Sequence, residues 1–389
     1  MSAIFATPPS FDRESHTSHL SKAFDTRPSP TATRIATIST GLIVSAKGKL
    51  TLDEKWPKPQ ILSRNEVCIR VETAGLNPLD WKSVRYNFNL PAFPWTIGRE
   101  VAGVVESIGL GVTNVAIGDR VWSSTYYRDV RAGTLQTHCV LPCHTVGVLP
   151  DNLSYEEGAS LGVPALTAAM TLWKWLKLPL PSVSLESRSI ASKGNPESDY
   201  LLIWGGASST GQFFTQLAAL SAQSGLQTIT VTSSASASLS KSLGAHHIIA
   251  RDGLSNQEIS SRVHEISKGR LRHAIDLVGA ETSQACFNLL GKSDYAGQRM
   301  LCPIAAPGFK PLAVGPRHGL VTVHDIEMKR FVLDPSNRIY MDILNQLGAA
   351  NWLRFPEREI VVGLERVEEA LNKMSLGQGG GKKWVVRIA

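Results

Sequence analysis

Short apolar runs separated by glycine turns dominate the first part of the chain. Between residues 36 and about 160, runs such as EVCIRVETAGL, GREVAGVVESIG and THCVLPCHTV are rich in strand-forming residues and are interrupted by turn residues. Strands at this spacing are typical of a small, twisted, barrel-like domain. We therefore predict a β-rich domain that begins near residue 36.

The pattern changes further along the chain. EEGASLGVPALTAAMTLWKWL, residues 156–176, has helical spacing, and the Pro- and Ser-rich connector after it is expected to be an exposed loop. From residue 199 to 305, strand-like runs such as YLLIW, TITVTS and HAIDLVG alternate with amphipathic segments. This alternation predicts an α/β fold with a parallel, doubly wound sheet of the Rossmann kind. After residue 320 the pattern predicts a helix, a glycine-rich turn and a strand.

Length, charge and cysteine usage narrow the class of protein. The 389 residues are enough for two or three domains. The formal charge is +7, but the basic residues are scattered and not interleaved with aromatics, so we expect no nucleic-acid partner. No apolar run approaches the roughly 18 residues of a membrane span, so no membrane insertion is expected. Five dispersed cysteines, without a signal-peptide pattern, favour a reducing, cytoplasmic location.

The first 35 residues have a composition of their own. Residues 1–35 are rich in Ser, Thr and Pro and lack hydrophobic periodicity, which indicates a disordered N-terminal tail. A mitochondrial transit peptide is the alternative, because three arginines lie in this stretch. Three acidic residues in the same stretch favour the tail, since transit peptides avoid acids.

A stretch without large side chains follows the first strand of the alternating region. WGGASSTGQ, residues 204–212, contains a GxxSxxG pattern. In a strand–turn–helix unit, small residues let a diphosphate approach the backbone N–H groups at the start of the helix, where the helix dipole also attracts anions. We therefore predict a dinucleotide site formed by Gly205, Gly206, Ser208, Ser209, Thr210 and Gly211. The alternative is a tight turn that binds nothing.

The end of the second strand predicts which nicotinamide cofactor is used. NAD-binding proteins place an acidic residue there to bind the ribose hydroxyl, whereas this chain has VTSSASAS, with no acid between Asp199 and Asp252. The hydroxyls of Ser233 and Ser234 are able to bind a 2′-phosphate, and Arg251 follows the next strand. These residues predict NADPH. The alternative is that they belong to solvent-exposed loops.

Six stretches of the chain follow one another in a characteristic order: AGLNPLDWK, IGREVAGVVESIGLGVTNVAIGDRVW, WGGASSTGQ, KSLGAHHII, GLERVEEALNKM and GGGKKWVVRI. Together they resemble the medium-chain dehydrogenase/reductase superfamily. The arrangement is most similar to the zinc-free quinone-oxidoreductase and enoyl-reductase branch, in particular the fungal trans-acting enoyl reductases of polyketide biosynthesis. The resemblance implies a GroES-like catalytic domain made of residues 36–165 and 321–389, around a Rossmann domain at residues 166–320.

The resemblance also implies catalysis without a metal. Zinc-dependent members hold the metal through a cysteine and a histidine at positions where this chain has Asn77 and Arg99. No cysteine lies between Leu76 and His138, so the four-cysteine structural site is missing. The segment THCVLPCHTV is the alternative metal site, but adjacent residues on a strand point to opposite faces. We interpret its thiols and imidazoles as structural.

The same resemblance implies candidate catalytic residues. Lys82 corresponds to a cationic residue near the cleft, and the alternative is a solvated surface lysine. Tyr86 is a candidate proton donor, although the enoyl reductases with a catalytic tyrosine place it slightly further along the chain. Thr167 corresponds to a position beside the nicotinamide, and the alternative is a helix threonine packed through its methyl group. Asn77 occupies the former ligand position and is expected to line the cleft.

Two further residues enter the prediction of the cofactor site and its surroundings. The trans-acting enzymes usually carry a lysine a few residues past the second strand, where this chain has SASAS. Arg251 or Lys382 would have to replace that cation. Asp276, at the end of HAIDLVG, is interpreted as a turn residue and not as a base.

The leading hypothesis is an NADPH-dependent reductase of an activated C=C bond. The expected substrate is an enoyl thioester of secondary metabolism, carried by an acyl carrier, with a polyketide synthase as partner. One alternative is a quinone or 2-alkenal reductase that acts on free small molecules, and another is a catalytically silent NADPH-binding protein. Both a monomer and a homodimer are compatible with the resemblance.

Overall fold

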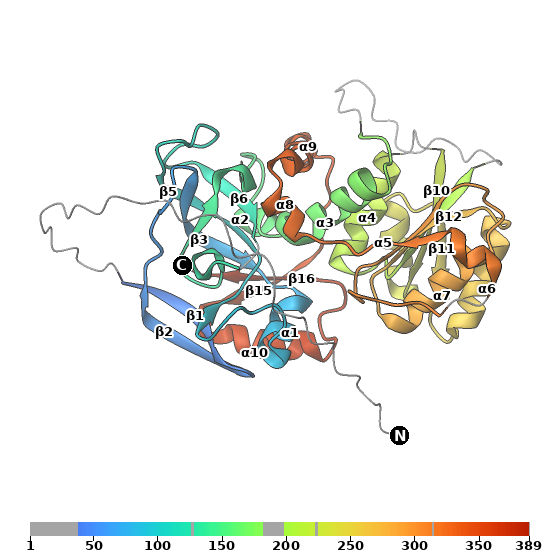
Figure 1. Cartoon of the computed structure of the whole chain (residues 1–389), viewed down its shortest axis with the longest axis horizontal. Coiled ribbons are helices and arrows are strands. Elements are labelled where there is room, and N and C mark those ends of the chain that lie inside the picture. The colour runs from blue at the N-terminus through green and yellow to red at the C-terminus, as the bar shows by residue number, and fades with distance from the viewer. Residues whose placement is uncertain (1–37, 126–127, 182–197, 222–224, 313–314, 389) are drawn as a thin grey trace, which may run out of the picture. The chain divides into compact units, whose positions relative to one another are not determined.

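The computed structural model describes residues 38–125, 128–181, 198–221, 225–312 and 315–388. Within these ranges the strands form three sheets (Figure 1). The tail predicted for residues 1–35, and most of the connector predicted after residue 176, lie outside the described residues. No helix in the described part combines the length and the apolar character needed to cross a membrane.

A six-stranded, wholly parallel sheet confirms the predicted doubly wound fold. Its order is β11-β10-β9-β12-β13-β14. The chain runs outward from β9 to β10 and β11, and then returns to the other side of β9 with β12. Ligands of such sheets bind at the carboxyl ends of the strands where the order reverses, here between β9 and β12. The strands are β9 (Asp199–Trp204), β10 (Leu226–Thr232), β11 (His247–Ala250), β12 (Leu271–Asp276), β13 (Arg299–Pro303) and β14 (Val321–Val323).

Four helices follow the strands of this sheet in turn. Residues of β9 and β10 are almost all buried, as expected for a parallel sheet covered on both faces. The sheet extends to β14, slightly beyond the domain boundary expected at residue 320. The helices are α4 (Ser209–Leu220), α5 (Ala237–Ser242), α6 (Asn256–Ser267) and α7 (Ala280–Gly291).

The β-rich part contains a seven-stranded and a three-stranded sheet. The seven-stranded sheet has the order β15-β16-β3-β5-β6-β8, and β7 also pairs with β3. The late strand β16 is antiparallel to β3, so the last strand of the chain joins the N-terminal sheet. The strands are β3 (Glu66–Gly75), β5 (Glu100–Ile108), β6 (Arg120–Ser124), β7 (His138–Pro142), β8 (Val146–Val148), β15 (Arg358–Val362) and β16 (Lys383–Arg387), with β1 (Ile38–Ala46), β2 (Lys49–Pro57) and β4 (Trp95–Thr96) in the smaller sheet.

A helical run links the β-rich part to the parallel sheet, as the spacing of residues 156–176 predicts. It is not one regular helix, because two wider π-type segments, η3 (Leu161–Ala165) and η4 (Met170–Trp175), flank the short helix α3 (Leu166–Ala169). Pro164 lies inside η3 and has no N–H to donate, which disfavours a regular ladder there. The other helices are α1 (Pro78–Tyr86), α2 (Tyr155–Gly158), α8 (Lys329–Leu333), α9 (Arg338–Ala349) and α10 (Val367–Ser375).

Candidate active site

The glycine turn between β9 and α4 has no room for side chains. Gly205 has a φ of +99°, a conformation that L side chains rarely adopt. A Cβ on Gly206 would lie 2.1 Å from Thr230 Cγ2, and a Cβ on Gly211 would lie 2.3 Å from the Gly205 carbonyl oxygen. The first turn of α4 therefore packs against the backbone of the glycine turn, and Gly206 packs against the Thr230 side chain of β10.

Ser208 fixes the geometry of this turn. Its hydroxyl donates to the Gly205 carbonyl (2.9 Å) and accepts from the Gly211 N–H (3.0 Å), which makes it the N-cap of α4. Ser209 and Thr210 form the first turn of the helix, where N–H groups have no intrahelical acceptor. A rigid turn with open N–H groups at a helix start fits a dinucleotide diphosphate.

The second strand ends in a site that differs from the sequence-based expectation. The backbone N–H of Ser234 donates to the carboxylate of Asp252, so an acid does reach the end of β10. The expectation of a site without a carboxylate is therefore wrong. Thr232 on β10 pairs with Ala250 on β11, which places Asp252 from the neighbouring strand beside Ser234.

Ser233 and Arg251, which were also predicted here, lie at the same end of the sheet. Ser233 donates from its hydroxyl to Ser236 Oγ (3.1 Å). The backbone N–H of Arg251 donates to the Thr232 carbonyl (2.8 Å), and its side chain is exposed to solvent. Lys382, the alternative cation, lies with its ammonium 3.6 Å from Glu357.

A buried polar network surrounds Asn77, which is only 4% exposed. The Asn77 amide nitrogen donates to Glu100 Oε1 (2.8 Å), and its amide oxygen accepts from the ammonium of Lys383 (3.0 Å). Lys383 also forms an ion pair with Glu100 and donates to the Leu76 carbonyl (2.9 Å). Asn77 therefore bridges the buried side chains of Glu100 and Lys383, and both ends of its amide are occupied by these hydrogen bonds.

The network extends to both neighbouring helices. The second oxygen of Glu100 accepts from the backbone N–H of Val163 in η3 (2.8 Å). Asp80 in α1 accepts from the Asn77 backbone N–H (2.7 Å), and burial raises the pKa of its carboxyl to about 6 although the Arg99 guanidinium opposes the shift. We call Asn77, Asp80, Glu100 and Lys383 the buried charge network.

The other predicted catalytic residues have fewer contacts. Lys82 is half-buried on α1, with its ammonium 5.7 Å from the ring centroid of Trp81. Tyr86, at the end of α1, is 57% exposed, and its ring meets the Trp81 ring edge-on. Within the described residues, no hydrogen bond or ion pair joins Lys82 to another predicted site residue. Thr167 lies in α3 and is 4% exposed.

A glutamine that the sequence reasoning missed joins the two halves of the candidate site. Gln212, one residue after Gly211, donates from its side-chain amide to the carbonyls of Ala207 (2.9 Å) and Gly381 (3.1 Å). Gly381 needs to be glycine, because a Cβ there would lie 2.3 Å from the Ala207 oxygen. Two residues later the chain reaches Lys383, so this contact connects the glycine turn to the buried charge network.

The remaining polar groups that the sequence analysis singled out make other contacts. His138 faces Glu106 (3.5 Å), whereas His144 contacts the carbonyl of Val332 (2.8 Å), so the imidazoles of THCVLPCHTV diverge. In the part of the chain that is described, no three His, Cys, Asp or Glu residues form a cluster suited to a metal. Asp276 accepts from the Gly279 N–H (3.0 Å) and the Ser283 hydroxyl (2.8 Å), as expected of a turn residue.

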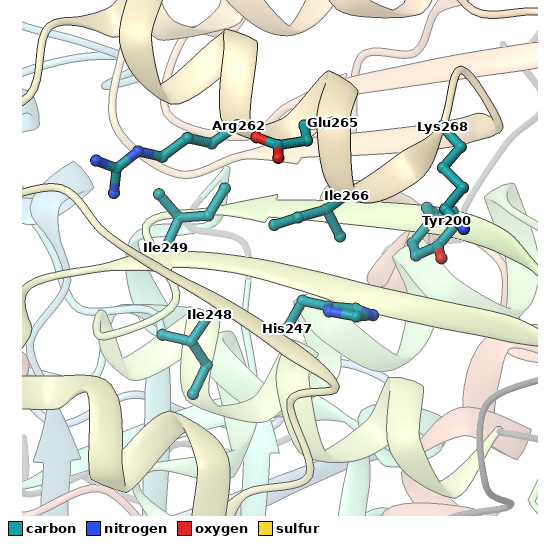
Figure 2. Close-up of a pocket in the computed structure, with 8 residues that line it drawn as sticks. All are labelled: Tyr200, His247, Ile248, Ile249, Arg262, Glu265, Ile266 and Lys268. Carbon is teal, nitrogen blue, oxygen red and sulfur yellow. The ribbon is translucent and has the colours of Figure 1, made fainter.

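A pocket beside the six-stranded sheet is lined by residues of β9, β11 and α6 and by Lys268. Figure 2 shows the pocket, whose lining includes Tyr200 near the start of β9, His247 at the start of β11 and Lys268 just after α6. The glycine turn follows the opposite, carboxyl end of β9. This pocket is therefore separate from the candidate site.

Comparison with known proteins decides the family. Residues 63–171 match the model of the alcohol dehydrogenase GroES-like domain. A dehydrogenase of Monascus pilosus is 30% identical over 260 residues, which are 65% of this chain and 68% of that relative. The chain belongs to the medium-chain dehydrogenase/reductase superfamily. The predicted superfamily and its combination of a GroES-like and a Rossmann-type domain are thereby confirmed, and the chain is an oxidoreductase of that superfamily.

Other members of the superfamily extend the comparison. A trans-enoyl reductase of Aspergillus japonicus is 28% identical over 336 residues, covering 83% of this chain and 90% of the relative. The enoyl reductase component of the lovastatin nonaketide synthase of Aspergillus terreus is 30% identical over 259 residues, covering 65% and 67%.

Solved structures share the fold of the chain. The quinone oxidoreductase of Pseudomonas syringae pv. tomato has a TM-score of 0.72 at 22% identity, covering 90% of this chain and 100% of the other. The quinone oxidoreductase of Escherichia coli, solved in complex with NADPH, has a TM-score of 0.69 at 17% identity, covering 90% and 99%.

Proposed function

We propose that the protein is an NADPH-dependent reductase of an activated C=C bond, with an enoyl thioester as its substrate. The glycine turn carries the proposal, because a Cβ on Gly211 would meet the Gly205 oxygen at 2.3 Å and the turn leaves backbone N–H groups open at the start of α4. The names of the fungal relatives supply the reaction class. Bound NADPH would supply the hydride for the reduction.

Residues of the chain divide between binding and catalysis in this proposal. Ser209 and Thr210 bind the diphosphate through their backbone N–H groups. Ser233 and Arg251 lie at the end of the sheet where the adenosine ribose would be held, and Arg251 supplies an exposed cation for the 2′-phosphate. Thr167 is proposed to hold the nicotinamide carboxamide.

Catalysis requires stabilisation of the negative charge that develops on the thioester oxygen during reduction. Lys82 and Tyr86, on α1, are the proposed sources of a cation and of a proton. Lys383 is unsuitable for this role, because Glu100, Asn77 and the Leu76 carbonyl already occupy its ammonium. Asn77 is proposed to support the cleft wall, since its amide is committed to the buried charge network.

The proposed substrate implies a partner. An enoyl thioester of polyketide biosynthesis is held on an acyl carrier, so the protein would act on a chain presented by a polyketide synthase. The name of the Aspergillus terreus relative, an enoyl reductase component of such a synthase, supports this partner.

A test with three acceptors separates the proposed function from its alternatives. Purified protein and NADPH are mixed with a crotonyl thioester, a free enone or a quinone, and nicotinamide absorbance is followed. We expect turnover of the thioester above the others. Turnover of only the enone or quinone would replace the proposal by a free-acceptor reductase, and binding of NADPH without any turnover would indicate a silent binding protein.

A further inference from the structure

A carboxylate lies at the end of β10, where the adenosine ribose of the proposed cofactor would bind. Asp252 follows β11 and accepts a hydrogen bond from the backbone N–H of Ser234, the residue that begins the turn after β10. Acidic residues at the end of the second strand bind the ribose hydroxyls of NADH and repel a 2′-phosphate. Here the acid comes from the third strand and reaches the same place.

The position of Asp252 is fixed by its own backbone. The Arg251 N–H donates to the Thr232 carbonyl (2.8 Å), which holds the residue before Asp252 against β10. The Leu254 N–H donates to the Arg251 carbonyl (3.0 Å), and Gly253 has a φ of +73°, so Asp252 lies in a tight turn. The Ser234 hydrogen bond lowers the pKa of the exposed Asp252 carboxyl, so the group is ionised at neutral pH.

This end of the site therefore contains one residue that favours NADPH and one that favours NADH. Arg251 supplies a cation that suits a 2′-phosphate, whereas Asp252 supplies a negative charge and already occupies the Ser234 N–H. A dianionic phosphate placed there meets like-charge repulsion and lacks that backbone donor. A free ribose hydroxyl, in contrast, is able to donate to the carboxylate.

We propose that Asp252 is a specificity-determining residue of the cofactor site, which weakens the preference for NADPH and lets NADH bind as well. This inference rests on the proposed function, because it requires a nicotinamide cofactor at the glycine turn. It predicts that the two cofactors bind the unaltered protein within about tenfold of one another, since an exposed charge shifts affinity only modestly.

The test measures dissociation constants for NADPH and NADH by calorimetric titration. Asp252→Ala removes the charge and frees the Ser234 N–H, whereas Asp252→Asn removes the charge but retains an acceptor. We expect Asp252→Ala to tighten NADPH binding about tenfold, Asp252→Asn about threefold, and both to leave NADH equal or weaker. The matched control is Glu265→Gln, which removes one exposed charge from α6 beside the pocket drawn in Figure 2.

The outcomes separate this inference from the proposed function. An unchanged NADPH-to-NADH ratio in Asp252→Ala, or the same change in Glu265→Gln, would overturn the role of Asp252 while leaving the reductase proposal intact. Titration with 2′,5′-ADP and 5′-AMP should show the same ratio change, because these fragments report only on the adenosine end. Absence of binding by either cofactor to the unaltered protein would overturn both proposals.

Discussion

The glycine turn and the buried charge network lie close together but are built in opposite ways. The turn has no room for a Cβ at Gly206 or Gly211, so that Gly211 and Gly205 meet backbone to backbone. The network instead fills its space with polar and acidic or basic side chains, among which Lys383 is 1% and Glu100 is 0% exposed. The turn leaves N–H groups open for a ligand, whereas the Lys383 ammonium has three protein partners. The first region therefore leaves donors that the proposed cofactor would use, whereas the second holds two helices and two strands in place.

The largest effect is expected where the network loses a charge. Lys383→Met should lower the free energy of unfolding by about 3–5 kcal/mol, because Glu100 would stay buried without its counter-charge. Lys382→Met is the matched control, since the neighbouring side chain is 43% exposed and should change stability by less than about 0.5 kcal/mol. Denaturant unfolding measures both. Equal decreases in the free energy of unfolding would mean that the buried Lys383 contributes no more to stability than the exposed Lys382.

A methyl group in the turn should have the next largest effect. Gly211→Ala places a Cβ 2.3 Å from the Gly205 oxygen, so we expect about 1–3 kcal/mol of destabilisation and weaker NADPH binding. Gly319→Ala is the control, because nothing crowds a Cβ at that position, which precedes β14 at the amino-terminal ends of the strands. Thermal unfolding and cofactor titration check the pair. An alanine tolerated equally at both positions would show that the turn is not closely packed.

The contact between the two regions provides a third test. Gln212→Met removes the donor to the Ala207 and Gly381 carbonyls, which should cost about 1–2 kcal/mol and weaken NADPH binding. Gln216→Met, one turn later on α4, loses two hydrogen bonds to the backbone of Arg354 instead. We expect both variants to be destabilised but only Gln212→Met to bind NADPH less tightly. Equal NADPH affinities of the two variants would mean that the contact of Gln212 with Gly381 does not contribute to the cofactor site.

The smallest expected effect is a pH dependence confined to the network. Burial raises the pKa of Asp80 to about 6, despite nearby Arg99 and Lys383, while an unfolded chain has a value near 3.9. Stability from this group is therefore complete below about pH 4 and is lost as the pH rises through 6. The stability of the unaltered protein should fall by about 1 kcal/mol more than that of Asp80→Asn between about pH 5 and 8.

Denaturant midpoints at several pH values measure this difference. The amide that Asp80→Asn introduces would still offer an oxygen to the Asn77 N–H, so the comparison isolates the charge. If the free energies of unfolding of the two proteins changed with pH in parallel, the pKa of Asp80 would be the same in the folded and the unfolded protein. The predicted rise of this pKa by burial would then be wrong.

Local patterns predicted the first region and missed most of the second. The glycine turn is readable because Gly205, Ser208 and Gly211 act within seven residues of one strand–turn–helix unit. Lys383 and Glu100 are 283 positions apart, and no periodicity records which strands meet. Lys383 directly precedes the apolar residues WVV, and its sequence neighbours do not indicate that Glu100 is its partner.

The cofactor end of the site shows the same limit. The sequence places no acid directly after β10, and along the chain that observation is correct. Parallel pairing of Thr232 with Ala250 nevertheless brings Asp252 to Ser234, because residues that follow neighbouring parallel strands meet at one edge of the sheet. Gln212 was missed for a related reason, since its second acceptor, Gly381, comes from a distant loop.

A calorimetric titration of NADPH tests the central claim that the glycine turn binds a dinucleotide. The account predicts saturable, one-to-one binding by the unaltered protein and by Gly319→Ala, and markedly weaker binding by Gly211→Ala. An unaltered protein that gives no binding heat and no thermal shift at saturating NADPH would contradict the account, as would a Gly211→Ala variant that binds with undiminished affinity.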